Sequence, residues 1–386
     1  MYFLKSIFNE LKNTLKNRDI IVLLLLAPIA LTLLFGGVYL NDYVEEVPIA
    51  VLDEDNSSMS RMIVQQFYEN NRFDLKYYAN TREELEELVE DGKAKMAVYI
   101  PKDLYKDILA GRSSEVMIAL DGTNMIISNN AYSSAAEIIQ TIGAGAQIKA
   151  ISGKGMMPQV AQNTALAFKF TDRTVYDPRM TYMNYLILGY IAIFLQQVIV
   201  SGLGISVLKD MEKLKRENNI VQTIMDIMAK IIACGFYSLI SIYASVYIVS
   251  NLFNVNIRGS MESMFILSIM FIIAISGPAI ILAVMTGEKI KLAQISFMLS
   301  LPTFVSCGYV WPIDQMPEAL VKGVKAIWPL IYFARPFDEV LFKGVPLEVM
   351  KGNLISMAKY AAFWLPVSIL MLRLRKRTKE KPVEAN

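Results

Sequence analysis

The 386-residue sequence contains no histidine and only two cysteines. Zinc sites are built mainly from cysteine and histidine, and haem iron is most often held by the same residues, so neither group is expected here. Without histidine, a Ser-His or Cys-His nucleophilic pair cannot be assembled. The phosphate-binding pattern G-x-x-x-x-G-K-[ST] does not occur anywhere in the chain. These absences argue against an enzyme and against a nucleotide-hydrolysing domain in this chain.

Charged residues are missing from several long stretches of a sequence that is 54% hydrophobic. A helix needs roughly 20 consecutive apolar residues to cross a bilayer. Backbone groups in lipid must be paired within the segment, so such runs are expected to be helices. Six runs come close to that length, the last with one lysine near its end: 20–40, 183–208, 231–257, 263–287, 292–310 and 355–372. The predicted fold is an α-helical polytopic membrane protein with six transmembrane helices.

Lysine and arginine are distributed unevenly, although the net charge is only +2. If the N-terminus lies inside the cell, the inner segments hold 17 of these residues in 59 positions: 1–19, 209–230, 288–291 and 373–386. The short outer segments hold 6 in 52 positions: 252–262 and 314–354. Short cytoplasmic loops are enriched in lysine and arginine, so both termini are predicted to be cytoplasmic, with 373–386 as a basic tail. The two cysteines, Cys234 and Cys307, then lie toward opposite membrane faces, and no disulfide is expected.

The first 19 residues predict an amphipathic helix at the membrane surface. One helical face carries the large apolar side chains, and the lysines lie mainly elsewhere: Leu4, Phe8, Leu11 and Leu15. Such a helix suits the inner membrane–water interface. The alternative is a short helix packed on another protein segment. The following run, 20–40, is expected to remain as an uncleaved anchor, because no small-residue cleavage site follows it.

Residues 41–182 predict a soluble domain between the first two transmembrane helices. Four strand-like stretches alternate with helical ones: 47–52, 73–78, 94–100 and 115–120. Alternating strands and helices are typical of an α/β domain, and about 140 residues are enough for a core of its own. The assigned topology places this α/β domain outside the cytoplasm.

The segment DEDNSS, after the first of these strands, imitates the start of a calcium-binding loop. Asp53, Asp55 and Ser57 alternate as the first ligands would. The sixth position, however, is Ser58 instead of glycine, and the twelfth is Val64 instead of glutamate. We therefore expect the start of a helix here and no metal site.

The predicted transmembrane helices carry polar side chains but no acid or base deep in a span. Six of the polar side chains lie in the second and fifth helices: Gln196, Gln197, Ser201, Gln294, Ser296 and Ser300. Such groups usually hydrogen-bond between helices, a contact worth about 0.6 kcal/mol on average. The alternative is a weakly polar translocation path or a seam between subunits. Because ion-coupled transporters typically need ionisable groups in the membrane, coupling to an ion gradient is not expected.

The inner loop 209–230, KDMEKLKRENNIVQTIMDIMAK, is charged in its first half and apolar on one helical face in its second. Ile220, Ile224 and Ile227 make up that face. A short amphipathic helix in a cytoplasmic loop is suited to docking a partner protein. These residues favour equally the alternative of a surface helix that rests on lipid headgroups.

In their order along the chain, three stretches resemble the membrane subunit of type-2 ABC exporters, the permease subunits that carry a large extracytoplasmic domain after the first helix. VPIAVLDEDNSSMSR, together with DGTN, is similar to the opening and the late strand of that external domain. KRENNIVQTIM resembles the cytoplasmic motif E-R-E-x-G-T-x-E-x-L, which Arg216 and Glu217 match. Asn219, Ile220 and Gln222 replace its glycine, its threonine and its second glutamate.

The third stretch, CGYVWPIDQMP, resembles the motif S-G-F-x-F-P-x-x-x-M-P. Four positions match this motif: Gly308, Pro312, Met316 and Pro317. Cys307 stands where serine is usual, and Tyr309 and Trp311 replace other aromatic residues. Further on, WPLIYFARPFDEVLFKG (328–344) resembles a P-L-x-Y-F stretch that ends in K-G. The resemblance covers nearly the whole chain.

This resemblance implies that two permease subunits pair, either two copies of this chain or one copy with a homologous permease. Each would dock a separate ABC ATPase, which would bind ATP and magnesium, and this chain would hold no cofactor. The ATPase coupling residues would come from the inner loop: Glu212, Arg216, Glu217, Gln222 and Met225. An external re-entrant segment, 311–354, would form a gate where it begins, with these residues: Gly308, Trp311, Pro312, Met316 and Pro317. Membrane lipid is an expected contact, and nucleic acid is not.

The resulting hypothesis is ATP-driven export of an amphiphilic drug, a lipid or a lipid-like compound across the cell (inner) membrane. A second hypothesis is a membrane-anchored receptor or scaffold whose external domain binds a partner. The charged inner loop favours the exporter, because a passive anchor has no need of it. A secondary transporter or channel would call for buried ionisable residues or an internal repeat, and the sequence offers neither.

Overall fold

The computed structural model describes residues 2–41, 44–153, 157, 159–160, 174–177, 181–216 and 219–375, without the side chains of 215 and 216. Contacts within the chain divide it into two compact units. We call them the helical unit, Met1–Leu40 with Val175–Asn386, and the inserted unit, Asn41–Thr174. The inserted unit ends before the predicted domain boundary at residue 182.

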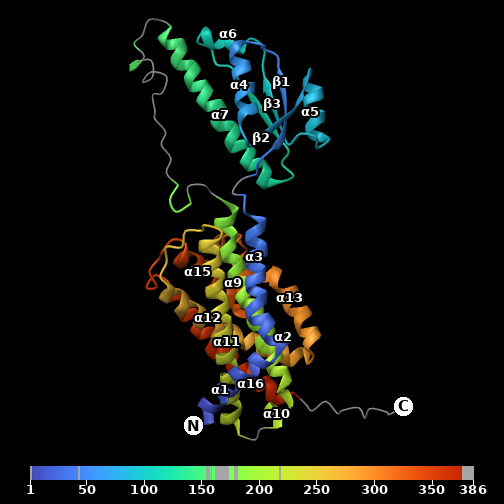
Figure 1. Cartoon of the computed structure of the whole chain (residues 1–386), viewed down its shortest axis with the longest axis vertical. Coiled ribbons are helices and arrows are strands. Elements are labelled where there is room, and N and C mark those ends of the chain that lie inside the picture. Colours follow the sequence, from blue (N-terminus) through green and yellow to red (C-terminus); the bar gives the residue numbers. More distant parts are fainter. Residues whose placement is uncertain are drawn as a thin grey trace, which may run out of the picture. The chain divides into compact units, whose positions relative to one another are not determined.

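The inserted unit is built around a four-stranded sheet (Figure 1). In the order β2-β1-β3-β4, its strands are β2 (Phe73–Tyr78), β1 (Val47–Asp53), β3 (Met96–Ile100) and β4 (Met117–Leu120). β1 pairs in parallel with both of its neighbours, and β4 pairs antiparallel with β3. Side chains alternate between the two faces of a strand. Ile49 and Val51 are therefore buried on one face, and Ala50 and Leu52 on the other.

Helices cover both faces of this sheet. One face packs against α4 (Ser58–Glu69), α6 (Leu104–Leu109) and α7 (Met125–Ser152), and the other against α5 (Arg82–Glu90). The DEDNSS segment starts α4, because the Ser57 hydroxyl accepts the backbone N–H groups of Met59 and Ser60 at 3.1 and 3.2 Å. This cap satisfies N–H groups that have no partner in the first helical turn. The inserted unit is thus an α/β domain.

Among its described residues, the helical unit contains five helices that are long and apolar enough to cross a membrane. The first, Arg18–Val38, runs through α2 (Arg18–Ile21), a π-helical stretch η1 (Val22–Leu26) and α3 (Ala27–Val38). The others are α9 (Tyr182–Lys209), α11 (Ile220–Asn251), α12 (Met261–Thr286) and α16 (Lys351–Leu374). This unit therefore has the architecture of a polytopic helical membrane protein.

The predicted span 292–310 differs from these five helices. α13 (Lys289–Ser306) forms there, but its 18 residues reach only about 27 Å, less than a hydrocarbon core of about 30 Å. Gln294, Ser296 and Ser300 also make it more polar. By length and composition, α13 is a shorter and more polar helix than the five spans.

The third span starts earlier than predicted. α11 begins at Ile220, whereas the sequence predicts that this span begins at residue 231 and that a loop precedes it. The Asn219 side chain caps the helix by accepting the N–H of Val221 at 3.0 Å. A short helix, α10 (Met211–Arg216), occupies the first part of the predicted loop. The expected short amphipathic helix is therefore the first turns of a 32-residue helix.

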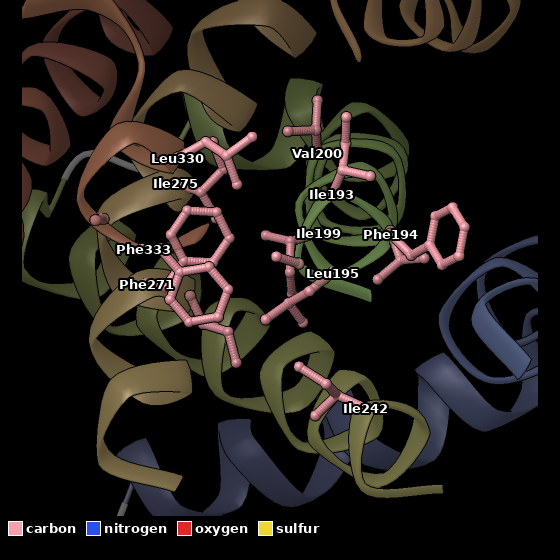
Figure 2. Close-up of a cluster of buried hydrophobic side chains, with 14 of the residues drawn as sticks. Ile193, Phe194, Leu195, Ile199, Val200, Ile242, Phe271, Ile275, Leu330 and Phe333 are labelled. Atoms are coloured by element: carbon pink, nitrogen blue, oxygen red, sulfur yellow. The ribbon is translucent and has the colours of Figure 1, made fainter. Parts of the chain in front are cut away.

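α9 lies at the centre of the helical unit, where α3, α11, α12 and α13 all contact it. Figure 2 shows its side chains Leu195 and Ile199 on the side that faces Phe271 and Phe333. The rings of Phe271, on α12, and Phe333 stack with centroids 4.2 Å apart and planes 8° from parallel. Because Phe333 comes from the chain between α13 and α16, this stack ties that segment to the centre of the bundle.

The segment between α13 and α16 is folded into short helices: η2 (Ile313–Gln315), α14 (Glu318–Ile327), η3 (Pro329–Tyr332) and α15 (Ala334–Leu341). Two hydrogen bonds hold the end of α14 against α16. The Trp364 indole donates to the Ala326 carbonyl at 2.9 Å, and the Tyr360 hydroxyl donates to the Ile327 carbonyl. Trp364 lies about 20 Å from the start of α16, at 1.5 Å per residue. The end of α14 therefore lies alongside the middle of a membrane span.

Candidate functional site

α1 (Tyr2–Lys16) lies along the start of α11, where two rows of polar side chains meet. Members of each row are four residues apart, which places them on one helical face. The rows pair in sequence order, so the two helices run in the same direction. Their members are Tyr2, Ser6 and Glu10 on α1, and Gln222, Asp226 and Lys230 on α11. We call this contact the α1–α11 joint.

Asp226 is the centre of the first half of the joint. Its carboxylate accepts the hydroxyl groups of Tyr2 and Ser6 at 3.0 and 2.9 Å. It also pairs with the Lys213 ammonium on α10 at 3.3 Å. The Gln222 amide completes this half by donating to the Tyr2 hydroxyl at 2.8 Å. A single buried carboxylate thus links α1, α10 and α11.

Lys230 is the centre of the second half. Its ammonium contacts Glu10 on α1 at 3.2 Å and Asp210, at the end of α9, at 2.5 Å. It also donates to the Ser206 hydroxyl on α9 at 3.3 Å. The Lys230 side chain is only 2% exposed. Moving a charge out of water costs several kcal/mol, so these partners are what allow the ammonium to be buried where α1, α9 and α11 meet.

The opposite side of α1 carries the apolar row predicted from the sequence. Leu4, Phe8 and Leu15 are exposed, whereas Leu11 is partly buried against the core. α1 therefore combines the two alternatives: it packs on another protein segment, and it presents an apolar surface outward. Exposed apolar side chains on a helix beside membrane spans are suited to lipid contact.

Three of the five predicted coupling residues have side chains that the structure describes. Glu212 is exposed on α10, and Met225 is half-buried on α11. The Gln222 amide points into the α1–α11 joint. The side chain of Arg216 and the whole of Glu217 lie outside the described residues. Of the predicted set, Gln222 therefore has an internal role in this structure.

The start of α11 exposes an apolar surface that we call the α11 tip. It consists of Ile220, Val221 and Ile224, which are 51, 51 and 39% exposed. Ile227, predicted on the same face, is fully buried, because the helix continues into the bundle at that point. The expected apolar face is therefore present on the first turn and a half of α11 and ends there.

Five of the six predicted seam residues take part in hydrogen bonds that cross between α9 and its neighbours. The Gln197 amide donates to the Ser296 hydroxyl at 2.8 Å, and the Ser201 and Ser296 hydroxyls lie 3.1 Å apart. The Ser300 hydroxyl donates to the side-chain carbonyl of Gln197. Gln294, the sixth residue, is exposed on α13 and lies outside this network.

Gln196 uses both ends of its amide. The nitrogen donates to the Thr303 hydroxyl at 3.0 Å, and the oxygen accepts the indole N–H of Trp328. Thr303 and Trp328 were missed by sequence reasoning. Thr303 continues the series of Ser296 and Ser300 on one face of α13, which is a detectable signal. Because these groups satisfy one another, the arrangement is that of interhelical hydrogen bonds.

The predicted gate residues share the turn between α13 and α14: Gly308, Trp311, Pro312, Met316 and Pro317. Gly308 has a φ of +86°, and a Cβ there would lie 2.3 Å from the Ile313 side chain, so glycine is required. Trp311 is 57% exposed, and Met316 packs against the core. The two prolines immediately precede η2 and α14, where a missing N–H leaves no helical hydrogen bond unmade.

This turn borders a cleft of about 820 Å³ whose other walls are the start of α9 and α15. Its charged groups are Asp177, Asp314, Arg335, Asp338, Glu339 and Lys343. Glu339 pairs with Arg335 at 3.2 Å and with Lys343 at 3.5 Å. The Asp338 carboxylate, in contrast to that of Glu339, accepts a hydrogen bond from the Tyr309 hydroxyl at 3.4 Å. Burial raises the pKa of Asp338 to about 6. Sequence reasoning did not single out this carboxylate.

Comparison with known proteins shows which proteins this chain resembles in sequence. A profile described as ABC-2 family transporter protein matches residues 18–370, which run through both units. The Inner membrane transport permease YhhJ of Escherichia coli (strain K12) is 24% identical over 392 residues, covering 97% of this chain and 98% of that protein. The Probable multidrug ABC transporter permease YbhR of the same strain is 20% identical over 318 residues, covering 81% and 82%. The Probable multidrug ABC transporter permease YbhS matches over 153 residues at 22% identity, covering 39% and 40%.

Proposed function

Because this chain belongs to the ABC-2 family of transporter proteins, it is the membrane permease component of an ABC transporter, and we propose that it exports amphiphilic drugs or lipid-like compounds. It is a multi-pass protein of the inner membrane. The names of the E. coli relatives, a transport permease and two multidrug permeases, support this substrate class. Permeases of this family associate with an ABC ATPase. In the proposed assembly two permease subunits pair, and separate ATPase chains bind ATP and magnesium.

The observation that carries the proposal is the α1–α11 joint, whose α11 residues all lie in the predicted coupling loop, 209–230. An ATPase that pushes on this loop would move α10 and the start of α11 together, because Lys213 and Asp226 connect them. Lys230 and Asp210 then pass that displacement to α9, the helix at the centre of the unit. Nucleotide drives such a change only to the extent that it favours one membrane state over the other.

The α11 tip supplies the docking surface in this proposal. Its three exposed apolar side chains stand next to the charged residues of the loop, and protein interfaces commonly combine an apolar centre with a polar rim. A receptor or scaffold that is merely anchored by its helices has no use for such a surface. Of the predicted residues that the structure describes, Glu212 is exposed on α10, while Gln222 and Met225 are only partly exposed on α11.

On the other side of the membrane we place the inserted unit, the 820 Å³ cleft and the turn after α13. Trp311 is suited to this location, because tryptophan is enriched at membrane–water interfaces. The hydrogen bonds between α9 and α13 would have to break for a path to open between these helices. The turn at Gly308 would then act as the external gate over that path.

Charge reversal in the loop tests the docking. The full-length chain should co-purify with the ABC ATPase encoded beside it and stimulate ATP hydrolysis. Combining R216E with E217R is expected to weaken this association about tenfold, equivalent to about 1.4 kcal/mol. K289E is the matched control, because Lys289 is an exposed lysine outside the loop. Normal association and normal hydrolysis in the double variant would show that the coupling assignment is wrong.

A further inference from the structure

An apolar cleft of about 630 Å³ lies between α12, α13, α14 and α16. Its walls include Pro278, Pro302, Gly323, Ile327, Trp328 and Trp364. Ligand pockets in proteins typically enclose about 300–1,000 Å³ and are lined mainly by apolar side chains. A proline inside a helix clashes with the carbonyl of the preceding turn and bends the helix. Pro278 lies in α12 and Pro302 in α13, so a bend in each helix is expected to widen the space between them at the cleft.

The polar side chains in these walls are already engaged. The hydroxyl groups of Thr303 and Ser306 donate to carbonyl groups of their own helix at 2.8 and 2.7 Å. The indole of Trp328 donates to the Gln196 side chain, and the indole of Trp364 donates to a carbonyl of α14. The cleft therefore offers an occupant only apolar contacts.

The cleft lies at the depth of the hydrocarbon core. Two of its helices, α12 and α16, are membrane spans. Trp364 is near the middle of the 24-residue α16, about 20 Å from its start. A hydrocarbon core is about 30 Å thick, so this part of α16 is remote from the headgroups at either end. The molecules that surround a protein at this depth are the acyl chains of lipids.

We propose that this cleft binds an acyl chain of a membrane phospholipid. The bound chain fills the space between α14 and the spans and supports α14, while the phosphate headgroup stays outside the cleft. A helix of a second subunit is a poor fit, because a cylinder about 10 Å across would fill 630 Å³ within about 8 Å of its length, less than two helical turns. The proposal does not depend on which compound is exported.

Gly323 provides a way to fill the cleft without disturbing its walls. It lines the cleft from α14, and a Cβ added there meets nothing within 4 Å. Gly323→Leu therefore places a side chain in the space that the acyl chain needs. Gly352→Leu is the matched control, because Gly352 also has open space around its Cβ and lies in α16 outside the cleft. Both changes replace a helical glycine with a better helix former, so this effect is common to the two variants.

Native mass spectrometry of the full-length chain in mild detergent, titrated with phosphatidylethanolamine or phosphatidylglycerol, measures the binding. The wild type and Gly352→Leu are each expected to bind one phospholipid molecule per cleft, whichever of the two lipids is added. The fraction of protein with bound lipid should rise with the length of the acyl chain. Gly323→Leu should reduce occupancy about tenfold, since the leucine fills volume that the chain needs. Unchanged retention in Gly323→Leu would overturn the proposal. The proposal would also be wrong if Gly323→Leu weakened self-association but not lipid binding, because the cleft would then be a subunit contact. It would likewise be wrong if an exported drug bound in the cleft and neither lipid did.

Discussion

Gln196 shows how a single polar side chain organises this bundle. Its amide joins α9 to Thr303 on α13 and to Trp328 after α14, and the three groups are nearly inaccessible to solvent. Each hydrogen bond on its own contributes modestly, but a buried donor left without a partner costs about 1–3 kcal/mol. The importance of Gln196 therefore lies mainly in the groups that it satisfies.

Replacing Gln196 by leucine should lower the free energy of unfolding by about 1–3 kcal/mol, because the Trp328 indole loses its acceptor. Thermal unfolding of the purified chain in detergent, followed by tryptophan fluorescence, measures this change. Gln294→Leu is the control, since Gln294 is exposed on the same helix as Thr303; its effect should stay within about 0.5 kcal/mol. If Gln196→Leu abolished export and left the unfolding midpoint unchanged, Gln196 would belong to the transport path and not to the packing.

At the level of helices, the α1–α11 joint depends on charges that are buried together. Replacing Lys230 by methionine leaves Glu10 and Asp210 without their shared cation. Breaking a buried ion pair in this way typically costs 3–5 kcal/mol, so Lys230→Met should fold in much lower yield and unfold at a clearly lower temperature. Size-exclusion chromatography and the unfolding midpoint report both effects.

Lys289→Met is the matched control for this substitution. Lys289 pairs with Asp19 at 3.5 Å, but both side chains are half-exposed or more, at 50% and 63%. Exposed pairs contribute about 0–1 kcal/mol. Equal losses in the two variants would mean that the joint does not hold α1 to α11.

The helices and strands could be predicted from the sequence wherever the pattern was local. Short strand-like stretches between helical ones predict the four strands of the sheet, and the DEDNSS segment predicts the start of α4. The start of α11 could not be found in this way, because Asp226 and Lys230 look like loop charges until their partners are known. Those partners lie on α1. The signal that was overlooked is the spacing of four residues in both polar rows.

At the level of the whole molecule, the order of motifs along the chain predicts the family, whereas contacts between distant segments leave no such local pattern. Most of the seam residues form hydrogen bonds between α9 and α13, because polar groups on two apolar helices have few other partners. Of the predicted coupling residues, Gln222 bonds to α1 instead of facing outward. Trp328 reaches Gln196 only through the fold of the whole segment between α13 and α16, and no periodic pattern encodes such a contact.

Orientation in the membrane can be tested with single cysteines. Both native cysteines are buried, so a membrane-impermeant maleimide should leave the wild type unlabelled. Lys93→Cys, in the inserted unit, and Lys291→Cys, in the first turn of α13, replace side chains that are 56% and 60% exposed. In intact spheroplasts the proposed topology predicts labelling of Lys93→Cys alone, and of Lys291→Cys only after permeabilisation. The reverse pattern would invert the topology.

The α1–α11 joint also dictates an order of assembly. Its paired residues are 220 positions apart in the chain. During synthesis the N-terminal parts of a protein appear first, so α1 has no α11 to pack against until α11 has been synthesised. Its exposed apolar row can hold it beside the membrane in the meantime. When α11 has been synthesised, Asp226 and Lys230 bind their partners on α1. These contacts then hold the α11 tip in position. The surface offered to an ATPase is therefore finished only after α11 has been synthesised, and it is finished by a segment that was synthesised well before it.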